Sequence, residues 1–154
     1  MKITKLGHCC LLIEIKGKRI LTDPGSYTVE SHSNLKEIDY VLFSHEHQDH
    51  YHIESLKIII RNNPNTVIYS NNSVSELLVT ENIKHVQVDN GDTISLGDVL
   101  LIGIGEKHAE MHNSVPLSNN IGFFNLTASS IAGSTPSGLS IFIPFMPKAS
   151  ASFT

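Results

Sequence analysis

Short apolar runs alternate with polar breaks over most of the chain, and this pattern predicts strands with helices between them. Turn signals separate the runs: Gly17 follows the second, Pro24 and Gly25 end the third, and Asn90-Gly91 opens a hairpin. The predicted strands cover residues 2–6, 9–15, 19–22, 38–44, 66–70, 83–89, 93–96, 99–104 and 121–124. We therefore expect a sheet-rich domain.

Two segments have helical spacing instead. Residues 54–61 place Leu56, Ile59 and Ile60 on one face, which is typical of an amphipathic helix. Residues 74–81 follow Ser73, and a glutamate three positions after that serine completes a capping-box pattern. Because helices alternate with strands, the pattern predicts an α/β or mixed α+β fold.

Composition narrows the class of protein. The chain has 154 residues, 40% of them hydrophobic, and a net charge of -4, which suits one compact domain. The mild acidity gives no reason to expect nucleic acid or a membrane as partner, and no apolar run could span a bilayer. The N-terminal residues lack a signal-peptide pattern, and the two cysteines, Cys9 and Cys10, are adjacent and make a poor disulfide. We expect a cytoplasmic protein.

Charge is distributed unevenly along the chain. All 9 histidines and all 15 acidic residues lie at or before His112, and Lys148 is the one charged residue after it. We therefore expect a domain over residues 1–126 and an atypical tail over residues 127–154, typical of a truncated or frame-shifted sequence.

The loop directly after the strand at 38–44 carries the candidate chemistry. Its sequence at 45–50 is HEHQDH, so three histidines and one aspartate fall within six positions. The alternation of His45 and His47 places both on one side of an extended segment, where they can share an ion, while Asp49 and His50 point elsewhere and suit a second ion. Such donors suit Zn²⁺, with Mn²⁺ and Fe²⁺ as alternatives, and one or two ions. A solvated histidine-rich loop is the other interpretation, and the density of donors argues against it.

This motif resembles that of the metallo-β-lactamase superfamily. Residues 6–14 and 20–24 resemble the opening strands of its ascorbate-phosphate-lactonase-like hydrolases, and residues 90–112 resemble a central hairpin and the loop behind it that supplies a histidine. The resemblance covers residues 1–124. It implies an αββα sandwich, in which two sheets pack face to face between helices.

The resemblance also implies roles for single residues. His45 and His47 would bind the first metal, and Asp49 and His50 the second. The third ligand of the first metal would be His108, with His112 as the alternative.

Further roles follow for neighbouring residues. Asp23 would orient a ligand histidine, and His8 is either a site residue or a turn histidine bonded to backbone. Glu46 and Gln48 are interpreted as spacers, and His52 as a cap of the following helix.

The implied chemistry is hydrolysis of a small molecule, a lactone, an ester or a phosphoester, by metal-activated water, with Asp49 orienting or deprotonating the nucleophile. Relatives supply a bridging aspartate and a last histidine after a short strand, and no Asp or His follows residues 121–124 here. We therefore expect that the second half of the sandwich is incomplete and that the site holds one metal ion rather than two. Formation of a homo-oligomer is one way to cover the core that this would expose. The alternatives are an inactive metal-binding remnant and a nuclease of this superfamily, and the net charge of -4 argues against the nuclease.

Overall fold

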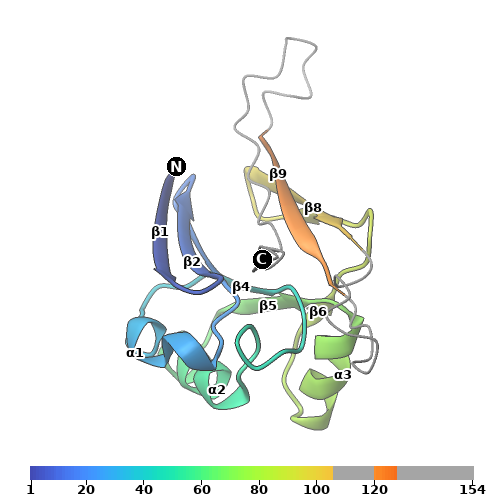
Figure 1. Cartoon of the computed structure of the whole chain (residues 1–154). Helices are drawn as coiled ribbons and strands as arrows, with labels where there is room; N and C mark the ends of the chain where they lie inside the picture. Colours follow the sequence, from blue (N-terminus) through green and yellow to red (C-terminus); the bar gives the residue numbers. More distant parts are fainter. Residues whose placement is uncertain (106–119, 128–154) are drawn as a thin grey trace, which may run out of the picture.

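Two β-sheets and a layer of helices make up the described part of the chain, residues 1–105 and 120–127 of a computed structural model (Figure 1). The strands are β1 (Lys2–Gly7), β2 (Cys10–Ile15), β3 (Lys18–Thr22), β4 (Tyr40–Phe43), β5 (Val67–Ser70), β6 (Val86–Gln87), β7 (Thr93–Ser95), β8 (Val99–Ile104) and β9 (Gly122–Thr127). The helices are η1 (Ser26–Thr28), α1 (Val29–His32), α2 (Ile53–Asn62) and α3 (Asn72–Thr80).

Strand direction brings one set of strand ends to a common edge. The first sheet has the order β1-β2-β3-β4-β5-β6, and the second has the order β7-β8-β9. Strands β1 to β3 are antiparallel neighbours, whereas β3 to β6 run parallel and are connected through α1, α2 and α3. The carboxyl ends of β1, β3, β4 and β5 therefore lie at one edge, where α/β proteins commonly bind ligands.

The central strands of the first sheet, β2 to β5, are buried on both faces. A helix-side core covers one face and consists of Cys10, Leu12, Leu21, Ile38, Val41, Phe43, Tyr51, Leu56, Ile59, Ile68, Val74 and Leu78. An inter-sheet core covers the other and consists of Ile13, Ile15, Ile20, Leu42, Val88, Ile94, Leu96, Val99, Leu101, Ile121 and Phe123. Strand β4 alternates between them, which explains why its sequence is a continuous apolar run.

These layers confirm the predicted fold class. Figure 1 shows the helices together on one side of the first sheet and β8 and β9 on the other, so three of the four layers of an αββα sandwich are present. No outer helical layer occurs in residues 1–105 and 120–127. No helix among these residues is long and apolar enough to cross a bilayer. The predicted boundary after residue 126 stays a prediction.

The predicted strands are all present, with shorter bounds at β4 and β6. The short helical segment at η1 and α1 was not predicted. The predicted cap of α3 was wrong: the Asn71 side chain, not that of Ser73, accepts a hydrogen bond from the Val74 amide at 3.0 Å. His52 does occupy the N-cap position of α2, but its ring bonds the Ser55 hydroxyl at 2.8 Å and makes no cap bond to backbone.

Candidate metal centre

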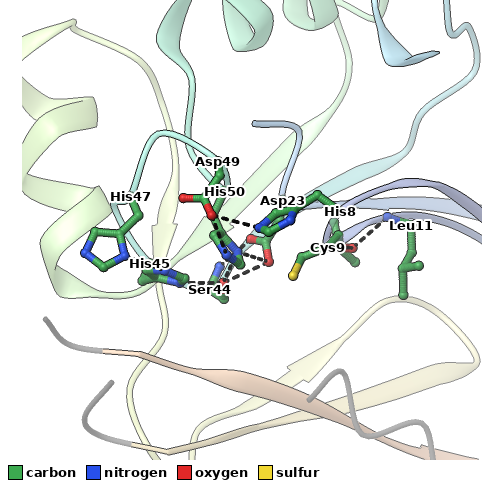
Figure 2. Close-up of polar contacts among 10 residues, drawn as sticks. His8, Cys9, Leu11, Asp23, Ser44, His45, His47, Asp49 and His50 are labelled. Atoms are coloured by element: carbon green, nitrogen blue, oxygen red, sulfur yellow. Dashed lines mark hydrogen bonds and ion pairs between the residues drawn. The ribbon is translucent and has the colours of Figure 1, made fainter. Parts of the chain in front are cut away.

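The histidine loop leaves the carboxyl end of β4 and folds back as a tight turn. The amides of His50 and Tyr51 both donate to the carbonyl of His47, at 2.8 and 2.7 Å. This turn gathers the side chains that Figure 2 shows facing one another. It also explains one wrong expectation: His50 does not point away from the histidine pair, because its ring centroid lies 3.9 Å from that of His45.

His45 and His47 present ring nitrogens to each other. Nε2 of His45 lies 3.1 Å from Nδ1 of His47, and the His45 side chain is buried. Two nitrogens bound to one tetrahedral Zn²⁺ at about 2.0–2.1 Å lie roughly 3.3 Å apart, so little movement is needed to place an ion between these rings. The pair that sequence spacing predicted is thus in position, although the segment is a turn and not an extended strand.

Asp23 and Ser44 fix the other side of these rings. The Asp23 carboxylate accepts hydrogen bonds from the Ser44 amide and hydroxyl, both at 2.8 Å. The same carboxylate lies 3.0 Å from Nδ1 of His50, and the Ser44 hydroxyl lies 3.0 Å from Nδ1 of His45. With Nδ1 engaged, Nε2 is the atom of each ring that can bind a metal, as in many sites where a carboxylate orients a ligand histidine.

Asp23 takes a conformation that few residues adopt. Its φ of 41° lies in the left-handed region, where a side chain is strained unless its surroundings hold it. The carboxylate is 3% exposed and makes the three contacts described above. The expected role of Asp23 therefore agrees with the geometry.

Charge at His50 follows from these neighbours. Burial disfavours its imidazolium, but hydrogen bonds and charges from Asp23 and Cys9 outweigh burial and raise the pKa of His50 to about 10. A metal that binds this ring must displace its proton, so binding releases a proton to solvent.

His8 lies in a turn and faces the histidine loop, as the first of its two interpretations expects. Its Nε2 lies 2.8 Å from Oδ2 of Asp49, and the same oxygen lies 3.7 Å from Nε2 of His50. The ring of His8 also meets that of His50 edge to face, with centroids 5.1 Å apart. His8 comes from the turn after β1, so the opening hairpin closes this side of the site.

Backbone packing holds the loop against the sheet. The Ser26 amide donates to the Gln48 carbonyl at 2.8 Å, and the Ile121 amide, just before β9, donates to the Ser44 carbonyl at 3.1 Å. A Cβ on Gly25 would overlap the Asp49 carbonyl and lie 2.6 Å from the His50 amide nitrogen. Only glycine allows this approach, so Gly25 sets the position of the Asp49–His50 peptide.

The structure thus brings together six of the predicted site residues: His8, Asp23, His45, His47, Asp49 and His50. His108 and His112 lie outside the described residues. Sequence reasoning missed Ser44, Cys9 and Gly25. Ser44 could have been found as the last residue of the apolar strand, and Cys9 as the neighbour of His8.

The donor set fits a divalent metal. Imidazole nitrogens and a carboxylate converge at one edge, and Ser44 and Asp23 hold the Nδ1 atoms of His45 and His50. Nitrogen and oxygen donors of this kind suit Zn²⁺, Mn²⁺ or Fe²⁺.

Comparison with known proteins agrees with the fold and the site. The Rv0786c protein of Mycobacterium tuberculosis is 28% identical over 94% of this chain and 66% of its own length. The UPF0173 metal-dependent hydrolase of Nanoarchaeum equitans is 32% identical over 80% of this chain and 54% of its own. The chain therefore spans about half to two thirds of the length of such relatives.

Solved structures share the architecture. A metal-dependent hydrolase from Parabacteroides distasonis matches with a TM-score of 0.70 and 21% identity, over 92% of this chain and 58% of that one. Igni18, a metallo hydrolase of Ignicoccus hospitalis, matches with a TM-score of 0.61 and 21% identity, over 81% of this chain and 55% of that one. The family model of the beta-lactamase superfamily domain matches residues 2–132. The chain belongs to this superfamily and has its metallo-β-lactamase fold.

Proposed function

We propose that the protein is a metal-dependent hydrolase of a small molecule. The observation that carries the proposal is the pair of facing nitrogens on His45 and His47, 3.1 Å apart, next to the Asp23–His50 pair. Relatives named metal-dependent hydrolases support it, among them those of Nanoarchaeum equitans and Flavobacterium johnsoniae.

In this proposal His45 and His47 hold the first ion, together with a histidine from the segment after residue 105, for which His108 is the candidate. Asp49 and His50 contribute ligands to the position of a second metal ion. When bound, Zn²⁺ (or Mn²⁺ or Fe²⁺) would lower the pKa of water and polarise the carbonyl or phosphoryl group of the substrate.

The chain itself supplies positioning and proton handling. Asp49 is 30% exposed, so its carboxylate can accept a proton from water at the open side of the site. Asp23 and Ser44 keep the rings of His45 and His50 in place and do not touch the substrate. The proposed substrate class is a lactone, ester or phosphoester. The net charge of -4 favours a small molecule over nucleic acid.

Metal analysis of purified protein beside a His47→Ala variant tests the proposal. We expect about one or two equivalents in the parent and at least about tenfold weaker metal binding in the variant, because even the loss of an outer hydrogen-bond partner weakens metal binding by about 10–100-fold. His85→Ala is the matched control, since His85 bonds only the Ile83 carbonyl among its described contacts.

Hydrolysis is then measured with p-nitrophenyl acetate, p-nitrophenyl phosphate and a γ-lactone. We expect turnover of at least one probe by the parent and by His85→Ala, and its loss after chelation and in His47→Ala. Absence of metal from the parent, or turnover that survives both treatments, would contradict the proposal.

A further inference from the structure

The turn between β1 and β2 brings a second set of metal-binding atoms to the site. One ring nitrogen of His8, the sulfur of Cys9 and one ring nitrogen of His50 all lie within 4.8 Å of one another. Donor atoms around one tetrahedral Zn²⁺ lie roughly 3.3–3.8 Å apart, so small side-chain movements would let all three reach one ion. Figure 2 shows His8 and Cys9 next to each other, close to Asp23.

This turn is held in place by the end of β3, which Asp23 directly follows. The Thr22 hydroxyl donates to the Cys9 carbonyl and accepts from the Leu11 amide, both at 3.1 Å. Thr22 directly precedes Asp23, which contacts His50 at 3.0 Å. One strand end therefore positions Cys9 and His50 together.

The two adjacent cysteines have different surroundings. Cys10 is fully buried in the helix-side core, and burial raises the pKa of its thiol to about 12. Cys9 is half-buried, and its side chain contacts His50. Core packing therefore accounts for Cys10 and leaves Cys9 for the site.

We propose that Cys9, His8 and His50, with Asp49, form a second metal position adjacent to the His45–His47 pair. Oδ2 of Asp49 lies 2.8 Å from Nε2 of His8 and 3.7 Å from Nε2 of His50, so it adds a fourth donor. Asp49 and His50 alone offer too few donors for a stable site. A thiolate also favours Zn²⁺ or Co²⁺ over Mn²⁺.

The ligand at this position is the Cys9 thiolate, and any proton that the Cys9–His50 pair carries without metal goes to solvent on binding. The inference rests on the proposed function only in sharing Asp49 and His50, and it requires metal binding but not hydrolysis.

Cobalt titration of the chelator-treated full chain tests the inference. Thiolate ligation of Co²⁺ gives a sulfur-to-metal charge-transfer absorption in the near ultraviolet, which ring nitrogens and carboxylates do not give. We expect this absorption in the parent and in the matched control Cys10→Ala. In Cys9→Ser we expect the absorption to disappear and one equivalent of bound cobalt to be lost. In His8→Ala we expect the apparent affinity for the cobalt ion that gives this absorption to fall at least about tenfold.

The outcomes separate this inference from the proposed function. In His47→Ala the charge-transfer absorption should persist, while the equivalent of cobalt bound at the His45–His47 pair is lost. Cobalt binding without this absorption in the parent, or absorption that survives in Cys9→Ser, would overturn the Cys9 position and leave the His45–His47 site standing.

A second measurement needs no variant. Alkylation of Cys9 by iodoacetamide, followed by mass spectrometry, should slow at least about tenfold when Zn²⁺ is added to the parent protein. An unchanged alkylation rate at saturating Zn²⁺ would contradict ligation by Cys9.

Discussion

One carboxylate, that of Asp23, connects the end of β3, the histidine loop and the ring of a candidate ligand. Asp23 accepts two hydrogen bonds from Ser44 and faces His50, so it fixes ring orientation and supplies negative charge next to the imidazole. In Asp23→Asn the shape is kept and the charge is lost. We expect zinc affinity to fall about 10–100-fold, because a carboxylate partner makes a ligand histidine a stronger donor.

The measurement is competition for Zn²⁺ against a chromophoric chelator at fixed pH. Asp39→Asn is the matched control, because Asp39 also accepts a backbone hydrogen bond, from the Arg19 amide at 2.8 Å, but precedes β4 instead of following β3. Equal zinc affinity in Asp23→Asn and Asp39→Asn would show that the charge of Asp23 does not strengthen zinc binding at the site.

Sequence alone predicted the residues that are close along the chain. His45, His47, Asp49 and His50 form a local motif, so their proximity did not depend on the fold. Ser44 and Cys9 were missed for a physical reason: their roles depend on contacts with Asp23 and His50 that form only when the ends of β1, β3 and β4 meet.

The site depends on the segment after β3, which packs on the loop after β4. Gly25 makes this contact, since any Cβ there would overlap the Asp49 carbonyl. In Gly25→Ala we expect the loop to shift, with about 1–3 kcal/mol lost from the free energy of unfolding and zinc affinity at least about tenfold lower. Thermal unfolding and chelator competition measure the two effects.

Gly17→Ala separates loop displacement from general destabilisation. Gly17 has a φ of 73° and nothing within 4 Å of its added Cβ, so alanine there is strained without touching the site. It should lower stability by about 1 kcal/mol and leave zinc affinity unchanged. A Gly25→Ala protein that binds zinc as tightly as Gly17→Ala would show that the Gly25 contact is not needed.

The strand pattern was the most predictable part of the fold, because apolar runs and turn residues identify strands locally. The cap of α3 was less predictable. Asn71 and Ser73 are both good capping residues, and the choice depends on where β5 ends, which places Asn71 at the N-cap of α3. The η1–α1 segment has too few apolar positions for a periodic signal.

The helix-side core and the inter-sheet core are coupled through one strand, β4. In β4, Val41 and Phe43 enter the helix-side core, and Leu42 enters the inter-sheet core. The loop that carries the candidate ligands continues directly from this strand. Loss of packing on either face should therefore disturb the same strand and the same site.

This coupling predicts that alanine substitutions in either core, on opposite faces of the first sheet, leave a single unfolding transition. Leu78 in the helix-side core and Leu96 in the inter-sheet core are both fully buried, so alanine at either position should lower the free energy of unfolding by about 2–5 kcal/mol. Val79→Ala is the control, because Val79 is 65% exposed on α3 and should change stability by less than about 0.5 kcal/mol.

Circular dichroism at a fixed free Zn²⁺ concentration measures this coupling, since bound metal itself shifts the transition. The far-ultraviolet signal reports the backbone. The near-ultraviolet signal reports tyrosines on both faces, because Tyr51 lies in the helix-side core and Tyr40 and Tyr69 pack against the inter-sheet core. Coincident transitions in both variants are expected, because β4 cannot leave one core while it remains in the other. A separate early transition in Leu96→Ala, with the helix-side signal retained, would show instead that the second sheet unfolds on its own and that the histidine loop depends on the first sheet alone.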